Sequence, residues 1–244
     1  MTIGVITDIH GNSVALDAVL ADAAPFGIDE WWVLGDLVAI GPDPVGVVER
    51  LQALPNATFV RGNTERYLTD GTPHGHGLSW TQEQLGPERL AWLRAMPLHA
   101  RVGRTLLVHA SPGRDDGPGL HPRLTDEHVR VLTRGCDADL VLVGHTHAPV
   151  DRIVDGIRIV NPGSVGNPTQ EDLGAGWAVI EGDDIELRRV AYDRDAVIAQ
   201  TLSCGIDVTD GILAHLRGEK IDRSGIRPDF DVHEFEPLLE AKRA

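Results

Sequence analysis

The chain has 244 residues, of which 42% are hydrophobic and 24% charged, and its formal net charge at pH 7 is −15. This length suits one large globular domain or two small ones, whereas the acidic balance argues against general nucleic-acid binding and against anionic membranes. No apolar run approaches a membrane span, the N-terminus lacks the features of a secretory signal, and there are only 2 cysteines. We therefore expect a cytoplasmic protein.

Short β-branched runs alternate with helical patterns over the first two thirds of the chain. Strands are predicted at residues 3–7, 31–35, 57–62, 105–110, 140–145 and 157–161. Helices are predicted at residues 12–27, 44–54 and 125–135. Because strands that are apolar on both faces and alternate with helices are typical of layered α/β proteins, we expect that fold class.

The later part of the chain has a different pattern. Residues 150–164 and 176–192 each read as two strands joined by a tight turn, which predicts a second, largely antiparallel sheet. Residues 66–103 predict a small helical excursion, or lid, over one edge of the core. We therefore expect one domain over residues 1–192, followed by a helical C-terminal tail at 193–244, packed on the domain or trailing from it.

Potential metal ligands follow five of the predicted strands. A single histidine after a strand is usually a polar turn, but ligands bind at the carboxyl ends of strands in α/β sheets, and five such endings indicate a shared crevice. These candidate ligands are Asp8, His10, Asp36, Asn63, His109, His145 and His147.

These side chains offer nitrogen and oxygen but no sulfur. Seven ligands are too many for one tetrahedral zinc and suit two divalent ions such as Mn, Fe, Zn, Ni or Co. Two such ions and two carboxylates leave a charge of about +2 in an otherwise acidic protein, which attracts a phosphoryl group. The pattern therefore predicts a small phosphorylated substrate, with a nucleotide among the candidates.

The ordered series D-x-H, G-D, G-N, H and G-H-x-H resembles the calcineurin-like metallophosphoesterases over roughly residues 1–181. The opening D-x-H-G-N is similar to the small bacterial and archaeal phosphodiesterase branch of that superfamily. The resemblance implies an α/β/β/α sandwich of four layers, in which two facing sheets are flanked by helices.

The resemblance also implies roles for individual residues. Asp8, His10 and His147 would bind the first metal, Asn63, His109 and His145 the second, and Asp36 would bridge them. Manganese is the favoured metal, and a hydroxide held between the ions would be the nucleophile. Asn12 would reach the substrate phosphate.

The chain departs from the family pattern at one position. Many members read G-N-H-D where this chain reads G-N-T-E, with Thr64 on the substrate side in place of a histidine that assists the leaving group. General acid catalysis is worth about 10²–10⁴-fold, and good leaving groups need it least. The substitution favours phosphodiesters, activated esters and anhydrides. His76 is a candidate replacement acid, although a solvated loop histidine is the commoner interpretation.

Two neighbouring features complete the expectations. Glu65 is expected to take the place of the family's Asp as a support behind the metal ligands, for instance by orienting a histidine, and the Asp115–Asp116 pair is expected to lie in a solvated loop. The favoured function is a binuclear metal-dependent phosphoesterase. Hydrolysis of dinucleoside polyphosphates is the alternative, and a non-catalytic scaffold, as in the retromer subunit of this fold, is a weaker one. The physiological substrate, the metals and the oligomeric state stay open.

Overall fold

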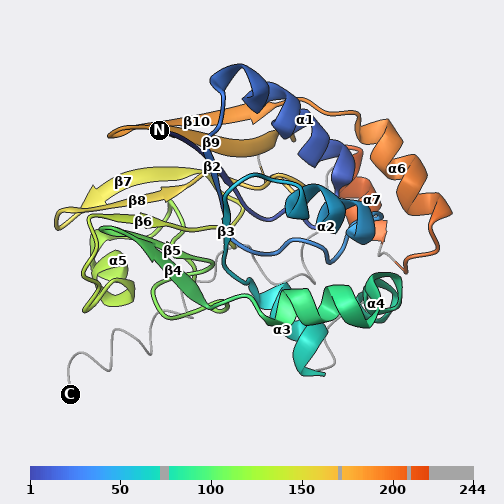
Figure 1. Ribbon diagram of the computed structural model, residues 1–244, viewed down its shortest axis with the longest axis horizontal. Helices are drawn as coiled ribbons and strands as arrows, with labels where there is room; N and C mark the ends of the chain where they lie inside the picture. Colours follow the sequence, from blue (N-terminus) through green and yellow to red (C-terminus); the bar gives the residue numbers. More distant parts are fainter. Residues whose placement is uncertain (72–76, 170–171, 208–209, 220–244) are drawn as a thin grey trace.

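The computed structural model describes residues 1–71, 77–169, 172–207 and 210–219, and these form two facing five-stranded sheets flanked by helices (Figure 1). Sheet A has the order β10 (Asp184–Val190), β9 (Ala175–Glu181), β1 (Thr2–Ile6), β2 (Glu30–Val33) and β3 (Ala57–Phe59). Sheet B has the order β4 (His99–Val102), β5 (Thr105–Val108), β6 (Leu140–Leu142), β8 (Ile157–Asn161) and β7 (Val150–Val154).

The helices lie outside the two sheets. Helices α1 (Ser13–Ala23) and α2 (Pro44–Gln52) contribute to the apolar cluster on the outer face of sheet A, and α5 (Asp126–Leu132) to that of sheet B. The remaining helices are α3 (Asn63–Asp70), α4 (Leu78–Arg94), α6 (Arg194–Ser203), α7 (Asp210–Leu216) and the short 3₁₀ helix η1 (Ala24–Phe26). The predicted α/β/β/α sandwich is confirmed.

Alternation along the strands produces three apolar layers between these four structural layers. Successive side chains of a strand point to opposite faces. In β9, Ala178 and Ile180 lie in the cluster between the sheets, whereas Trp177 and Val179 pack on the helix side. Leu107 of β5 likewise joins the cluster between the sheets. Strands apolar on both faces therefore build the interior of the sandwich.

The second sheet differs from the prediction. Strands β5, β6 and β8 are parallel to one another, and only the edge strands β4 and β7 are antiparallel to their neighbours. The hairpin of β9 and β10 joins sheet A, where β9 pairs antiparallel with β1. The expectation of a separate, largely antiparallel C-terminal sheet is wrong, because a hairpin pattern specifies pairing within itself but not the sheet that it extends.

The stretch 66–103 contains more than helices. It includes most of α3, then α4 with a kink at Gly86 before Pro87, and finally β4 at the edge of sheet B. In the tail, α6 buries Val197 and Thr201 against the rest of the chain. Residues 220–244 and His76 lie outside the described residues. Among the described residues, no helix is long and apolar enough to cross a membrane.

Candidate metal centre

The loops that follow the parallel strands of both sheets converge at one end of the sandwich. Strands β1, β2 and β3 run parallel, so Asp8, Asp36 and Asn63 follow their carboxyl ends in turn. The loops after β1 and β2 are joined directly: Asp8 N donates to Gly35 O at 2.9 Å and His10 N to Asp36 O at 3.0 Å. These backbone hydrogen bonds extend the pairing of β1 and β2 into the loops that hold the candidate ligands.

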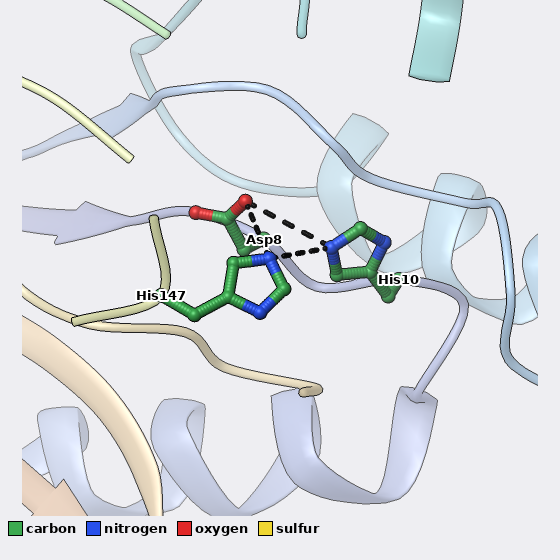
Figure 2. A group of neighbouring side chains, drawn as sticks. All are labelled: Asp8, His10 and His147. Atoms are coloured by element: carbon green, nitrogen blue, oxygen red, sulfur yellow. Dashed lines mark hydrogen bonds and ion pairs between the residues drawn. The ribbon is translucent and has the colours of Figure 1, made fainter. Parts of the chain in front are cut away.

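Asp8, His10 and His147, the first group, point their polar atoms at a common point (Figure 2). The Nε2 atom of His147 lies 3.2 Å from Asp8 Oδ1, and the Nε2 atom of His10 lies 3.8 Å from the same oxygen. The two Nε2 atoms are 3.0 Å apart. Residues more than a hundred positions apart in the chain thus form one buried cluster.

Asn63, His109 and His145, the second group, lie next to it. Asn63 Oδ1 is 3.0 Å from His145 Nδ1, and the rings of His109 and His145 meet edge to face with centroids 5.2 Å apart. Asp36 lies between the groups: its Oδ2 is 3.7 Å from His10 Nε2 and its Oδ1 is 3.4 Å from His109 Nε2. All seven candidate ligands are therefore brought together.

Asp8 also lies close to residues of both the first and the second group. Its Oδ1 lies 3.9 Å from His109 Nε2, and two clusters whose ligand atoms are close enough to hold an ion share this carboxylate. One cluster is the first group, and the other consists of Asp8, Asp36 and His109. Both carboxylates are thus within reach of each side of the centre.

Backbone carbonyls set which nitrogen of each histidine faces the centre. His109 Nδ1 contacts Leu34 O at 2.6 Å, and His147 Nδ1 contacts Asn167 O at 2.7 Å. A ring nitrogen that faces a carbonyl must carry the proton, so in the neutral ring the other nitrogen presents a lone pair. In His145 the roles are exchanged, because its Nε2 contacts Gly117 O at 3.0 Å. Each of these three rings therefore turns its other nitrogen toward the centre.

The backbone is strained at most of these positions. The φ angles are 53° at Asp8, 50° at His10, 54° at Asp36, 65° at His145 and 54° at His147. The left-handed region costs an ordinary L-residue roughly 1–2 kcal/mol. Strain of this kind persists only where the surrounding structure enforces it, and it concentrates at functional sites. Five of the seven candidate ligands adopt this conformation.

The electrostatics of the centre favour added positive charge. Burial works against ionisation of Asp36, but His109 outweighs it and holds the pKa of Asp36 below its usual value. Burial also opposes a charge on His109, yet Asp36 and Asp8 raise its pKa to about 10. For His10 burial prevails over the attraction of Asp36 and lowers its pKa to about 4. Two ionised carboxylates are thus buried beside a protonated His109 and a neutral His10, and a cation at the centre would replace the positive charge that His109 carries.

The donor set fits divalent cations. His109 Nε2, the ring nitrogen that faces Asp8 and Asp36, is a buried atom that has no hydrogen-bond partner among the described residues. The lone pairs at His147 Nε2 and Asp8 Oδ1 also face each other, and two acceptors approach this closely only with a cation or a proton between them. Nitrogen and oxygen ligands without sulfur suit borderline and hard divalent ions.

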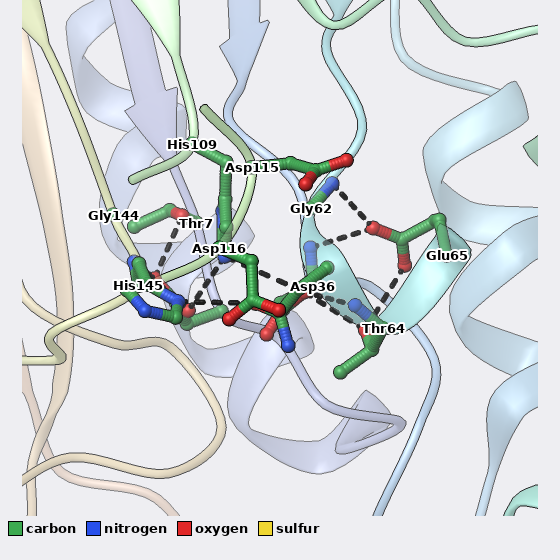
Figure 3. A network of polar contacts seen from close by, with 12 residues as sticks. Thr7, Asp36, Gly62, Thr64, Glu65, His109, Asp115, Asp116, Gly144 and His145 are labelled. Carbon is green, nitrogen blue, oxygen red and sulfur yellow. Dashed lines mark hydrogen bonds and ion pairs between the residues drawn. The ribbon is translucent and has the colours of Figure 1, made fainter. Parts of the chain in front are cut away.

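Thr64 and Glu65 both support Asp36 (Figure 3). The amide and hydroxyl of Thr64 each donate to Asp36 Oδ1 at 2.9 Å. Glu65 is buried and accepts hydrogen bonds of 2.8 Å from the amides of Asp36, Leu37 and Gly62. Glu65 thus has the expected supporting role, but its partners are backbone amides and not a histidine: its carboxylate shapes the backbone that carries Asp36.

Asn12 and the Asp115–Asp116 pair lie in surroundings that differ from those expected from the sequence. Asn12 caps α1 by accepting from Ala15 N at 3.0 Å, and its amide donates to Gly166 O at 3.2 Å. The expectation of a solvated Asp115–Asp116 pair is wrong for Asp115, which is only 7% exposed, whereas the side chain of Asp116 is 39% exposed. Both carboxylates pair with arginines: Asp115 with Arg61 and Arg66, and Asp116 with Arg66. Sequence reasoning missed this network, since nothing in the local pattern reveals which helix covers the loop.

Comparison with known proteins identifies the family. Residues 1–184 match the model of the calcineurin-like phosphoesterase superfamily domain. The chain belongs to this superfamily. The resemblance inferred from the motif series is thereby confirmed, and the family supports a phosphohydrolase, with metal dependence general to the family.

Two curated relatives and one solved structure show the range of similarity. Phosphodiesterase YfcE of Escherichia coli is 28% identical over 204 residues, which cover 80% of this chain and 94% of the relative. A symmetrical bis(5′-nucleosyl)-tetraphosphatase of Dechloromonas aromatica is 32% identical over 145 residues, covering 55% of this chain and 50% of the relative. A metallophosphoesterase structure from Sphaerobacter thermophilus superposes with a TM-score of 0.79 at 29% identity, covering 89% and 99% of the two chains.

Proposed function

We propose that this protein is a phosphodiesterase that acts through two divalent cations, with manganese the favoured metal. The observation that carries the proposal is the meeting of two buried ligand groups around the shared carboxylates Asp8 and Asp36. Bound cations would lower the pKa of a water molecule and neutralise charge on the phosphoryl oxygens. An acidic protein with a cationic centre of this kind selects an anionic, small phosphorylated substrate.

The chain's own residues would divide the binding work. Asp8, His10 and His147 would hold one cation, Asn63, His109 and His145 the other, and Asp36 would contact both. Asp36 suits that role because its two oxygens face histidines of different groups. Of the residues expected at the substrate, Asn12 and Thr64 use their described hydrogen bonds within the protein. We therefore propose that the cations, and not these two side chains, provide the main substrate contacts.

The environment of Thr64 supports substrates with good leaving groups. This position, where many family members have a histidine, holds a hydroxyl that donates to Asp36 at 2.9 Å. A threonine hydroxyl does not ionise near neutral pH and so is a poor general acid. The leaving groups of aryl diesters, activated esters and phosphoanhydrides depart without a general acid, whereas those of alkyl monoesters depend on one. His76, the alternative acid, lies outside the described residues.

The relatives support a diester over an anhydride. The phosphodiesterase relative is matched over 94% of its length, whereas the tetraphosphatase relative is matched over only 50%. Dinucleoside polyphosphates are therefore the second candidate substrate. A non-catalytic scaffold has no need of seven ligand-capable residues at one point, and their convergence speaks against that role. The 2 free cysteines support the cytoplasm as the proposed compartment.

The test compares bis(nitrophenyl) phosphate with nitrophenyl phosphate, using protein stripped of metal and then supplied with Mn²⁺. We expect activity to return with the metal and to favour the diester. Diadenosine tetraphosphate is assayed in parallel, and its products distinguish an anhydride hydrolase. Failure to hydrolyse any of the three substrates, with two cations demonstrably bound, would contradict an enzymatic role.

A further inference from the structure

A chain of hydrogen bonds connects His145 to the loop after β5. His145 Nε2 contacts Gly117 O at 3.0 Å, which requires the proton on Nε2 and leaves the lone pair on Nδ1. The same residue's amide, Gly117 N, donates to Asp116 Oδ1 at 2.7 Å. Asp116 therefore holds Gly117, the residue whose carbonyl sets the tautomer of His145.

The other oxygen of Asp116 leads back to α3. Asp116 Oδ2 accepts from the Tyr67 hydroxyl and from Arg66 Nη2, the latter at 3.1 Å. Tyr67 lies four residues after Asn63 in α3, so the two side chains share a helix face. The Asn63 side chain lies close enough to the Tyr67 hydroxyl to act on it as a hydrogen-bonding group, which works against the burial that raises the pKa of Tyr67. Asn63, in turn, places Oδ1 3.0 Å from His145 Nδ1, which closes the circuit.

The direction of each hydrogen bond in this circuit follows from simple chemistry. An ionised carboxylate only accepts, so the single proton of the Tyr67 hydroxyl must be donated to Asp116. The Tyr67 oxygen can then only accept, which requires Asn63 to present its NH₂ to it. The amide oxygen of Asn63 is consequently directed at the lone pair of His145 Nδ1. Two acceptors held face to face are the arrangement that a cation needs.

We propose that Tyr67 and Asp116 are positioning residues that hold Asn63 and His145 in the ligating orientation for the second cation. The inference rests on the two-cation centre proposed above, and it adds two residues that contact neither the cation nor the substrate. Without the Tyr67 hydroxyl, the Asn63 amide loses the acceptor that distinguishes its two ends. Rotation of that amide would then exchange the positions of its oxygen and its NH₂ group. The NH₂ group, which repels a cation, would face the site in place of the ligand oxygen.

The test measures Mn²⁺ binding to Tyr67→Phe by calorimetry and by the electron paramagnetic resonance signal of a coupled manganese pair. Partners that orient metal ligands typically contribute about 10–100-fold to affinity. We expect the second Mn²⁺ to bind about 10–100-fold more weakly, the coupled signal to weaken, and the first Mn²⁺ to bind as before. Tyr192→Phe is the matched control, because it removes the hydroxyl of the chain's only other tyrosine, which contacts Asn12 instead.

A second variant separates positioning from general damage to α3. In an Asn63→Asp background both side-chain oxygens can ligate, so the orientation supplied by Tyr67 is no longer needed. There we expect Tyr67→Phe to lose most of its effect on the second Mn²⁺. Equal losses in both backgrounds, or unchanged binding by Tyr67→Phe, would overturn this inference while leaving the proposed function intact. A wild-type protein that binds no cation pair would instead overturn the proposed function.

Discussion

The first and second groups of side chains are held in place by different means. Asp8, His10 and His147 all sit on left-handed backbone, with φ angles of 50–54°, and the loops around them are joined by backbone hydrogen bonds. In the second group only His145 has a positive φ, and Asn63 instead begins a helix. Side-chain contacts from α3 and from the loop after β5 support this second group.

This difference predicts which substitutions would displace the side chains of the first group and which would displace those of the second. A ligand on strained backbone depends on the packing of whole loops, which the folding free energy of the domain enforces. A ligand oriented by side chains depends on single hydrogen bonds, and one substitution can release it. Asp36 belongs to both halves, since its two oxygens face histidines of different groups.

Asp36→Asn is the largest expected disruption, because it removes the charge that both groups share. The proposed cations would contribute several kcal/mol to the transition state, so we expect diesterase activity to fall by roughly 10³-fold. Binding of both Mn²⁺ ions should weaken together, as measured by calorimetry. An active variant, or one that loses a single ion, would show that Asp36 serves only one group.

Glu65→Gln tests the support beneath Asp36. Its carboxylate accepts from three backbone amides, and the glutamine NH₂ would face at least one of those donors. Hydrogen bonds to charged groups contribute about 1.5–3 kcal/mol, so the free energy of unfolding should fall by about that amount. Urea denaturation measures it, with Glu88→Gln on the exposed face of α4 as the control. Equal stability of the two variants would contradict the assigned role.

Ser164→Ala tests whether the first group depends on the packing of the loop that carries Asp8. Ser164 is fully buried; its hydroxyl donates to Asp8 O at 2.7 Å and accepts from Asn167 N at 2.8 Å. Losing both contacts should lower the free energy of unfolding by about 1–2 kcal/mol. The first Mn²⁺ should bind more weakly and the second unchanged. Ser203→Ala, on an exposed hydroxyl of α6, is the control. If only the second ion were lost, Ser164 would support the second group and not the first.

Thr64→Val is the smallest expected change. It removes the hydroxyl that contacts Asp36 but keeps the amide of residue 64, which donates to the same oxygen. We expect a loss of about 0.5–1.5 kcal/mol, or up to roughly tenfold in the rate on an aryl diester. Thr64→Ser should recover most of it. If serine and valine behave alike, the hydroxyl does not position Asp36.

Much of the fold could be predicted from local patterns. The β-branched runs that precede Asp8, Asp36 and His109 all became strands, and Thr125 caps a helix as its sequence context suggests. The convergence of the candidate ligands could be predicted as well, because each follows a strand and parallel strands end at one edge. Strand β4 was missed, since its residues alternate between exposed and half-buried positions at the edge of sheet B and lack an apolar signature.

What only the tertiary structure decided was the set of partners. The hairpin of β9 and β10 extends the first sheet, and Asp116 meets Tyr67 on a helix about fifty residues away. The sequence by itself determined which residues end each strand and which chemistry they bring, because periodicity and residue type act locally. It did not determine that Thr64 and Glu65 support Asp36, because such contacts depend on how loops from separate strands pack.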